Sequence, residues 1–339
     1  MKNNSLITIN CYESYFYFVV WSCAIIYSAY QFYLANNYFS DYNDIYSDFD
    51  SGWSWIGKKR DTSDQEWLVW LTLINQSHQY WNCQKFLTFM LNLIRYMFWC
   101  FFTELLLHFI YVNAIQYHLQ VLQNLNSWEL FGLGYCMGQF FFNKYVVIYG
   151  TCSNLCYLDD IKAPSQPKCI ARIHLYSDMW KHFDRGLYKF LIRYIYVPIR
   201  KSNRCFGKLF ASFLCFTFVF IWHGIQMNIF IWALLNFIGI VIENIGTSIG
   251  KSKQYYKMQN THLSSKNTKR LHCILASPLL AMSAISNFYF LGGQDIGNIF
   301  IQKIIHGSWK SLFILLFLLY CCCQVSVDIK RWELRHIKR

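Results

Sequence analysis

Residues 206–242, FGKLFASFLCFTFVFIWHGIQMNIFIWALLNFIGIVI, decide the class of fold. This stretch contains one formally charged side chain, Lys208, and one histidine, His223, near its middle. It is too long and too apolar for one element of a soluble core, and it is long enough for two membrane-spanning helices separated by a tight turn. We therefore expect a helical hairpin, with His223 beside the turn and inside the membrane.

The composition of the whole chain also indicates a membrane protein. Of its 339 residues, 55% are hydrophobic and 14% are charged, whereas ordinary soluble domains are about 25% charged. The 20% of aromatic residues is more than a soluble fold of this size can bury. These values exclude disorder, collagen, a coiled coil and a small disulfide scaffold. The predicted class is an all-α polytopic transmembrane protein with about seven spans plus interfacial or re-entrant helices.

The apolar runs and the segments between them give a single membrane-embedded domain. The expected spans cover residues 15–34, 86–115, 128–150, 209–222, 227–245, 271–291 and 312–325. The expected domain, residues 1–339, has a shortened N-terminal part (1–85), a core (86–325) and a basic cytosolic tail (326–339).

The net charge of +13 comes from short basic segments between apolar runs. Three such segments are 251–270, 330–339 and the group around Arg200. Two spans separate each from the next, so all three lie on one face, which the positive-inside rule makes cytosolic. Segment 292–303 is then lumenal. This distribution argues against a nucleic-acid partner and favours membrane lipids and a phosphate-bearing small molecule.

Two polar side chains stand out against the apolar background. A polar group inside the membrane is costly and tends to be functional, and imidazole is suited to proton transfer near neutral pH. The alternative for His223 is a buried histidine bonded to a carbonyl across the helix bundle. Asp184 lies in an apolar stripe, where a carboxylate is expensive unless paired. Its alternatives are structural contacts with Lys181 or Tyr188.

Residues 177–198 are expected to form one amphipathic helix around Asp184. Its basic side chains recur at intervals of four residues and so form a cationic ridge on one face. That ridge suits the phosphates of coenzyme A, and its alternative is a solvated or headgroup-contacting face. The ridge residues are Lys181, Arg185, Lys189 and Arg193.

Residues 177–198, SDMWKHFDRGLYKFLIRYIYVP, followed by Trp222-His223-Gly224, resemble the signature of the membrane-bound O-acyltransferase family. The sequence of these residues is most similar to the Hedgehog acyltransferase branch of that family. Together with smaller stretches, the likeness covers about three quarters of the chain. Those stretches are residues 61–67, 104–115, 141–150, 241–244 and 286–293.

The resemblance implies roles for individual residues. It makes His223 the catalytic histidine and Asp184 its partner, and it assigns the ridge to the phosphates of palmitoyl-CoA. The expected acyl-CoA-binding residues are Trp180, Lys181, Arg185, Lys189, Arg193, Trp222 and Asn287. The implied reaction moves palmitate from palmitoyl-CoA to the N-terminal cysteine amine of a secreted Hedgehog-type protein. The implied location is the endoplasmic reticulum membrane, with the Golgi as the alternative.

Cys169 differs from most of the 14 cysteines, which lie in apolar runs and serve as small hydrophobes. It stands in a polar loop after Pro167. The resemblance implies that its thiolate ligates the iron of haem b, a role that a cysteine thiolate can fill. The nearby basic residues Lys162, Lys168 and Arg172 favour that thiolate. The alternative is a free or lipidated cysteine.

The N-terminal half departs from the family pattern. Ser63 and Glu66 have capping-box spacing and open a short helix that carries Trp67 and is expected to be interfacial. The family then has several more spans, one with a re-entrant Asn-Gly-Pro element, before the helix that starts here near Leu91. Only about twenty residues stand in their place. A compact variant, a splice form and an incomplete gene model all stay open, and a walled tunnel is in doubt.

Other functions stay open beside protein palmitoylation. One is an acyltransferase with a lipid or glycerol-type hydroxyl acceptor. Another is a catalytically impaired short regulatory form, although such relatives typically lack the histidine found here as His223. The last is a structural membrane protein without activity.

Overall fold

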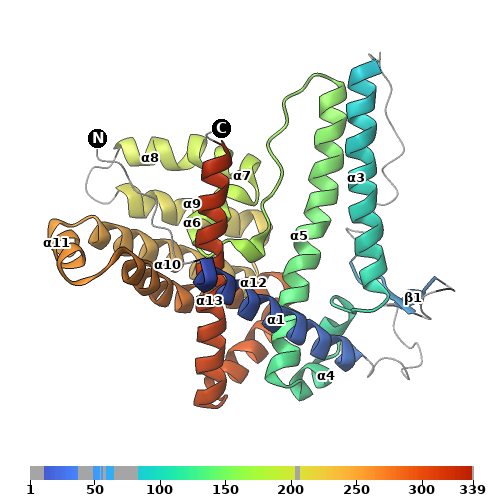
Figure 1. Ribbon diagram of the computed structural model, residues 1–339. Helices are drawn as coiled ribbons and strands as arrows, with labels where there is room; N and C mark the ends of the chain where they lie inside the picture. Colours follow the sequence, from blue (N-terminus) through green and yellow to red (C-terminus); the bar gives the residue numbers. More distant parts are fainter. Residues whose placement is uncertain are drawn as a thin grey trace. The chain divides into compact units, whose positions relative to one another are not determined.

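The computed structural model describes residues 11–36, 49–53, 55, 59–64, 83–202 and 207–337. Within these ranges the regular structure is helical, apart from one antiparallel pair of short strands, β1 (Phe49–Ser51) and β2 (Lys59–Asp61). The predicted all-α class is confirmed. The chain divides into two compact units (Figure 1). Unit 1 comprises residues 1–26, 171–181 and 190–339, and unit 2 comprises residues 27–170 and 182–189.

Unit 1 is a group of long helices from the C-terminal half. Helix α10 packs against α9 and α12, and α12 packs against α13. In Figure 1 these helices run from the yellow part of the chain, at α9, to the red part, at α13. The helices of unit 1 are the start of α1 (Cys11–Ala35), most of α6 (Tyr176–His182), the π-helix η5 (Leu191–Tyr196), α8 (Val197–Ser202), α9 (Gly207–His223), α10 (Met227–Gly250), α11 (Lys253–His262), α12 (Ser265–Ile305) and α13 (Trp309–Ile337).

Unit 2 is built on two long helices that lie side by side, α3 (Cys83–Leu107) and α5 (Ser127–Leu158) (Figure 1). A capping box formed by Asn126 and Glu129 starts α5. Further along, a Cβ on Gly150 would lie 2.2 Å from the ring of Tyr96, so the glycine lets the two helices approach closely. The shorter helices of this unit are η3 (Ala114–Tyr117), α4 (Leu119–Asn124), η4 (Ile170–Arg172) in part, and α7 (Arg185–Phe190) in most of its length.

Five described helices are long and apolar enough to cross a membrane: α1, α3, α10, α12 and α13. They confirm five of the predicted spans by length and composition. The predicted span 209–222 is the shorter apolar helix α9, and 128–150 lies in α5, which carries a buried Lys144 and is not among the five. The predicted helix at Trp67 and its capping box fall outside the described residues.

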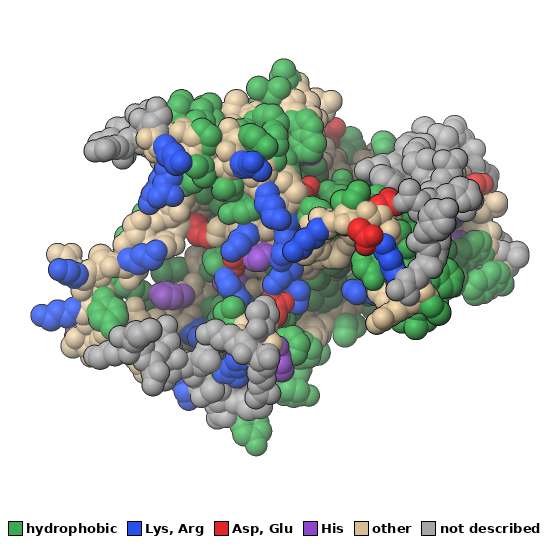
Figure 2. Space-filling view, turned by 90° about the horizontal axis from the view of Figure 1, so that it is seen from above, with side chains coloured by type: hydrophobic (Ala, Val, Ile, Leu, Met, Phe, Trp, Pro, Cys, Tyr) green, Lys and Arg blue, Asp and Glu red, His purple; other side chains and the backbone are tan. Residues whose placement is uncertain are grey.

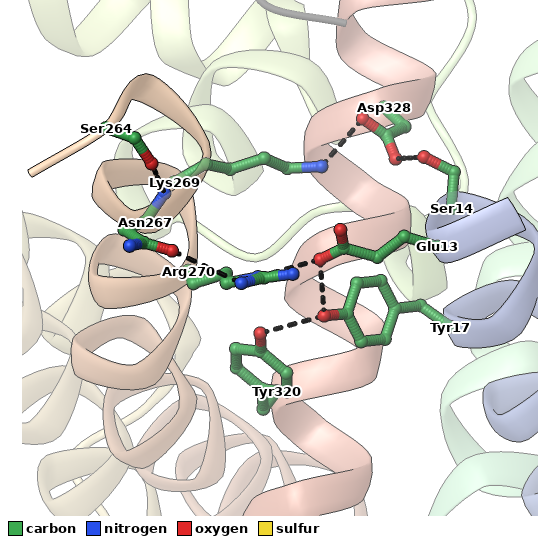
Figure 3. Close-up of polar contacts among 9 residues, drawn as sticks. All are labelled: Glu13, Ser14, Tyr17, Ser264, Asn267, Lys269, Arg270, Tyr320 and Asp328. Carbon is green, nitrogen blue, oxygen red and sulfur yellow. Dashed lines mark hydrogen bonds and ion pairs between the residues drawn. The ribbon is translucent and has the colours of Figure 1, made fainter. Parts of the chain in front are cut away.

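An ion pair joins the start of α12 to the last third of α13 (Figure 3). Lys269 Nζ lies 2.7 Å from Asp328 Oδ1, and the Lys269 side chain is only 4% exposed. Ser14 of α1 donates a hydrogen bond to the other oxygen of Asp328 at 2.7 Å. Two of the three basic segments therefore lie at the same end of unit 1. Which side of the membrane this end faces stays a prediction.

A second group of contacts binds α1 at the same level (Figure 3). Arg270 Nε donates to Glu13 Oε1 at 2.8 Å, and the hydroxyl of Tyr17 donates to the same oxygen at 2.9 Å. The hydroxyls of Tyr17 and Tyr320 lie 3.2 Å apart. We call these residues, together with Lys269, Asp328 and Ser14, the polar cluster.

Candidate active site

His223 is the last residue of α9, directly before the turn into α10. Gly224 follows with a φ of +115°, a conformation that residues with a Cβ rarely adopt. Its N–H donates to the carbonyl of Ile221, and its own carbonyl accepts from the N–H of Gln226. A glycine of this kind ends a helix. The prediction of a turn beside His223 is confirmed.

The imidazole of His223 is surrounded by aromatic rings and is exposed. Its centroid lies 5.4 Å from Trp232 of α10 and 5.1 Å from Phe290 of α12, both edge-on, and 4.9 Å from Trp222. No described residue forms a hydrogen bond with the imidazole, so the predicted alternative of a carbonyl-bonded histidine is not observed. Both ring nitrogens are therefore accessible to an incoming group.

Trp180 of α6 reaches the same cluster. Its Nε1–H donates to Asn236 Oδ1 at 3.0 Å, and its ring contacts Phe216 at 5.1 Å and Trp232 at 5.7 Å between centroids. Trp232 thus touches both Trp180 and His223. The structure therefore links the predicted residues Trp180 and His223 through Trp232, which was not among the predicted site residues.

Asn287 joins this cluster, whereas Trp222 lies at its edge. The Nε1–H of Trp232 donates to Asn287 Oδ1 at 3.4 Å. The amide nitrogen of Asn287 contacts the sulfur of Met179 at 4.0 Å. Trp222 contacts the ring of His223, yet the Trp222 side chain is 59% exposed. Asn287 is therefore placed to orient Trp232, and Trp222 mainly faces outward.

Helix α6 is held against α10 by close contacts at its first turn. Tyr176 is buried and lies against Gly239, where a Cβ would stand 2.4 Å from its ring. Next to it, the backbone N–H and hydroxyl of Ser177 both donate to the carboxylate of Glu243. Trp180 lies one turn after Tyr176 on α6 and meets Asn236, which lies about one turn before Gly239 on α10. Gly239 therefore permits the approach that brings Trp180 to the cluster.

The segment before α6 is anchored to α13. His174 Nδ1 lies 2.7 Å from the hydroxyl of Ser326, which also donates to the carbonyl of Arg172. The Arg172 guanidinium pairs with Glu333 at 2.7 Å. Burial lowers the pKa of His174 to about 4, so this imidazole is neutral at neutral pH. These contacts position the start of α6 within unit 1.

Asp184 belongs to unit 2 and lies between α6 and α7. Its Oδ1 accepts from the backbone N–H of Leu187 at 2.8 Å, and its Oδ2 accepts from the hydroxyl of Tyr149 on α5 at 2.9 Å. The predicted structural partners Lys181 and Tyr188 are therefore wrong for the carboxylate. His223 belongs to the other unit, so the pairing of His223 with Asp184 stays a prediction.

The predicted continuous helix over 177–198 is wrong. Helix α6 ends at His182, α7 begins at Arg185, and residues 191–196 form a π-helix. Asp184 is the physical reason for the break, because its carboxylate accepts the backbone N–H of Leu187 and so caps the start of α7 instead of continuing α6. The basic side chains therefore do not form one straight helical ridge.

The four predicted ridge residues differ in their surroundings. Lys181 and Arg193 belong to unit 1 and are exposed, as is Lys189 of unit 2. Arg185 of unit 2 is partly buried, and its Nη2 lies 3.2 Å from His182 Nδ1. Its Nε–H is buried without a hydrogen-bond partner in the described part of the chain. Figure 2 shows Lys and Arg side chains reaching the surface between hydrophobic ones.

Cys169 was the predicted ligand of a haem iron. Its thiol donates a long hydrogen bond to Gln139 Oε1 at 3.8 Å. The next side chain, Ile170, lies 3.2 Å from the position that a Cβ on Gly138 would take, so the loop packs directly on α5. The residues described contain no group of three or more His, Cys, Asp or Glu that could hold a metal ion. An axial haem ligand is a single thiolate and needs no such group, so haem ligation by Cys169 stays a prediction, and we derive no step through haem.

The sequence analysis missed three residues of the cluster: Trp232, Asn236 and Phe290. Asn236 carried a usable signal, because it is a polar side chain in the middle of an apolar span. Trp232 and Phe290 carried none, since aromatic residues make up 20% of the chain and occur in every span.

Comparison with known proteins shows the family of this chain. Residues 2–286 match the model of the membrane-bound O-acyltransferase family. The protein-cysteine N-palmitoyltransferase Rasp of Drosophila melanogaster is 36% identical over 246 residues, 72% of this chain and 49% of that protein. The protein-cysteine N-palmitoyltransferase HHAT of Mus musculus is 32% identical over 236 residues, 69% of this chain and 47% of that protein.

A more distant relative is the membrane-bound O-acyltransferase GUP2 of Saccharomyces cerevisiae, which is 26% identical over 69% of this chain and 37% of that protein. The chain spans about half the length of the two palmitoyltransferases that it matches. Because the family match covers most of the chain and both palmitoyltransferases exceed 30% identity, the chain belongs to the membrane-bound O-acyltransferase family.

Proposed function

We propose that this protein transfers a palmitoyl group from palmitoyl-CoA to the N-terminal cysteine amine of a secreted Hedgehog-type protein. The similarity to two protein-cysteine N-palmitoyltransferases supports transfer of a palmitoyl group to a protein cysteine. The donor and the Hedgehog-type acceptor are those that the resemblance of residues 177–198 and 222–224 implies. The observation that carries the proposal is the imidazole of His223, exposed within an aromatic cluster and not engaged by any described residue in a hydrogen bond.

His223 acts as the general base in this proposal. An α-amine has a pKa near 8 and is a nucleophile only after it loses a proton. The amine, neutral once that proton has passed to water, attacks the thioester carbonyl, and His223 accepts a second proton from the attacking nitrogen. The carbon–sulfur bond then breaks, an amide forms, and the proton passes to the departing thiolate of coenzyme A. General base assistance of this kind contributes about 10²–10⁴-fold to a rate.

The donor is held by its two chemically different ends. The rings of Trp180 and Trp232 supply an apolar wall for the acyl chain near His223. The basic side chains receive the phosphates of coenzyme A, and the unpaired Nε–H of Arg185 is a donor that a phosphate oxygen would satisfy. In this proposal, Asp184 holds the imidazole or contacts the region of the thioester.

Reversing the charge of Arg185 and Lys189 together is expected to raise the KM for palmitoyl-CoA more than the KM for the acceptor peptide. Two favourable charges near a phosphate are replaced by two repulsive ones. Steady-state kinetics with each substrate varied in turn measures this. The control is Lys253→Glu, on the exposed basic helix α11. A selective loss of peptide affinity would instead assign the basic side chains to the acceptor.

Asp184→Asn is expected to lower palmitoyl transfer about 100-fold while the protein still accumulates, because the amide keeps the shape but removes the charge. The matched variant Tyr149→Phe removes one hydrogen bond to Asp184 and leaves the charge in place. It should retain most of the activity. If both variants lose stability equally and keep full activity per folded molecule, the carboxylate has only a structural role.

The proposed location is the endoplasmic reticulum membrane, with the end of α13 on the cytosolic side. The clustering of basic residues at the starts of α11 and α12 and at the end of α13 supports this orientation. It would present these basic side chains to anionic lipid headgroups.

Membranes containing the protein test the function directly. Labelled palmitoyl-CoA is supplied with a peptide that carries a Hedgehog N-terminus, and label should appear in the peptide. The same peptide with an acetylated N-terminus should remain unlabelled, because its amine is blocked. Label that appears only in lipid would indicate a hydroxyl acceptor instead. Absence of any transfer would indicate the impaired regulatory form and refute the proposal.

A further inference from the structure

Two asparagine side chains hold the two tryptophans of the cluster. Asn236 accepts from the indole N–H of Trp180, and Asn287 accepts from the indole N–H of Trp232. Each pair links neighbouring helices: the first joins α6 to α10, and the second joins α10 to α12. The shorter of the two bonds, at 3.0 Å, is that of Asn236.

Asn236 is fully buried and uses both ends of its amide. Besides accepting from Trp180, it donates to the carbonyl of Trp232 at 2.8 Å and to the hydroxyl of Ser286 at 3.2 Å. A buried amide is costly unless its polar atoms are paired. The oxygen of Asn236 is paired only while the indole of Trp180 keeps its present orientation, so the hydrogen bond selects that orientation.

The orientation of Trp180 affects the surroundings of His223 through a series of ring contacts. Trp180 packs edge-on against Phe216 and at 40° against Trp232. Trp232 stacks on Phe290 at 4.4 Å, and both of these rings meet His223 edge-on. A rotated Trp180 would therefore disturb the surface against which His223 rests.

We propose that Asn236 is a positioning residue of the donor site: by fixing the indole of Trp180 against Trp232, it gives the palmitoyl chain a rigid aromatic wall beside His223. The inference rests on the proposed function, since it assigns the wall to the acyl donor. Asn236 itself touches no reacting atom and acts through Trp180.

The test replaces Asn236 with leucine in the full chain. Leucine keeps similar volume and removes the acceptor, so the KM for palmitoyl-CoA should rise about tenfold, the effect of losing one well-formed buried hydrogen bond. The KM for the acceptor peptide should stay within about twofold of the wild-type value, because the peptide does not contact this wall. A merely structural loss would lower the amount of active protein and leave both KM values unchanged.

Asn228 provides a matched control. It lies on the same helix and also donates to α12, at the carbonyl of Tyr289 over 3.3 Å, but it bonds to neither tryptophan. Asn228→Leu should leave the KM for palmitoyl-CoA unchanged. An equal rise in Asn228→Leu and Asn236→Leu would overturn the inference.

Trp180→Phe removes the indole N–H that donates to Asn236 and keeps an aromatic ring at this position. If Asn236 acts through the indole N–H, adding Asn236→Leu to Trp180→Phe should raise the KM no further. Fully additive effects would refute the inference. If Asn236→Leu does not accumulate, Trp180→Phe alone decides: an unchanged KM for palmitoyl-CoA overturns the inference, and a raised one supports it.

Binding of the thioether analogue of palmitoyl-CoA, which cannot be cleaved, separates this inference from the proposed function. If the wild type binds the analogue without transferring palmitate, the proposed function fails, and the Kd values of the same variants decide the role of Asn236. If the wild type transfers palmitate and Asn236→Leu binds as tightly as Asn228→Leu, the inference alone fails. A wild type that neither binds nor transfers refutes both.

Discussion

Replacing His223 with alanine is expected to lower palmitoyl transfer at least about 100-fold while the protein still inserts and accumulates. The imidazole is exposed and has no hydrogen-bond partner among the described residues, so its removal leaves no buried polar group unpaired. Its contacts are with the rings of Trp222, Trp232 and Phe290, which remain packed on one another or face outward. Transfer of label per folded molecule measures the effect.

His306 gives a matched control for this experiment. It is also an exposed histidine, and it caps the C-terminal end of α12. His306→Ala should keep wild-type transfer, because it lies outside the aromatic cluster. Should His223→Ala insert normally and retain its activity, the imidazole is not the base, and the mechanism proposed here fails even if the protein proves to be an acyltransferase.

Lys269→Met is expected to cost about 1.5–3 kcal/mol of stability, because the carboxylate of Asp328 loses its nearest charged hydrogen-bond partner. The Lys269 side chain is 4% exposed and that of Asp328 is 30% exposed, so water replaces the lost ammonium only in part. Ser14 still donates to Asp328, and Arg331 Nη1 lies 3.9 Å from Asp328 Oδ1, so the cost stays below that of a fully buried unpaired charge. Thermal unfolding of the purified protein in one detergent, followed by loss of α-helical signal, measures the change.

Two further variants show whether the loss of stability comes from the ion pair. Lys266→Met removes an exposed lysine from the same helix and should change the stability by no more than about 0.5 kcal/mol. The double variant Lys269→Met with Asp328→Asn removes both charges and should recover most of the loss. If Lys269→Met unfolds like Lys266→Met, the ion pair contributes nothing measurable.

Local pattern was enough to predict the helices and the turn at His223. The long apolar run indicated two helices with a turn near His223, and the structure places that turn at Gly224, whose positive φ excludes most other residues. The boundaries were less accurate where a helix bends without ending. Helix α12 extends to Ile305 because the break at Gly293, with a φ of +84°, is followed by more helix.

The site was harder to predict because its contacts join distant parts of the chain. Trp180 and Asn236 are 56 residues apart, and neither periodicity nor composition indicates that the indole and the amide meet. Asp184 is an example of the opposite kind, in which a local pattern indicates the wrong structure. Its spacing suited one continuous helix, but its carboxylate competes with the backbone and starts a new one at Arg185.

The polar cluster has a consequence for the biosynthesis of this protein. Ser14 and its partner Asp328 are separated by 314 residues, and Tyr17 and Tyr320 by 303. At a translation rate of about 5–20 residues per second, the ribosome needs roughly 15–60 s to make the chain between them. During that interval Ser14 lacks Asp328 and Tyr17 lacks Tyr320, while Glu13 keeps its bond to Tyr17 and gains Arg270 earlier, so the contacts that join α1 to α13 are the last of the polar cluster to form.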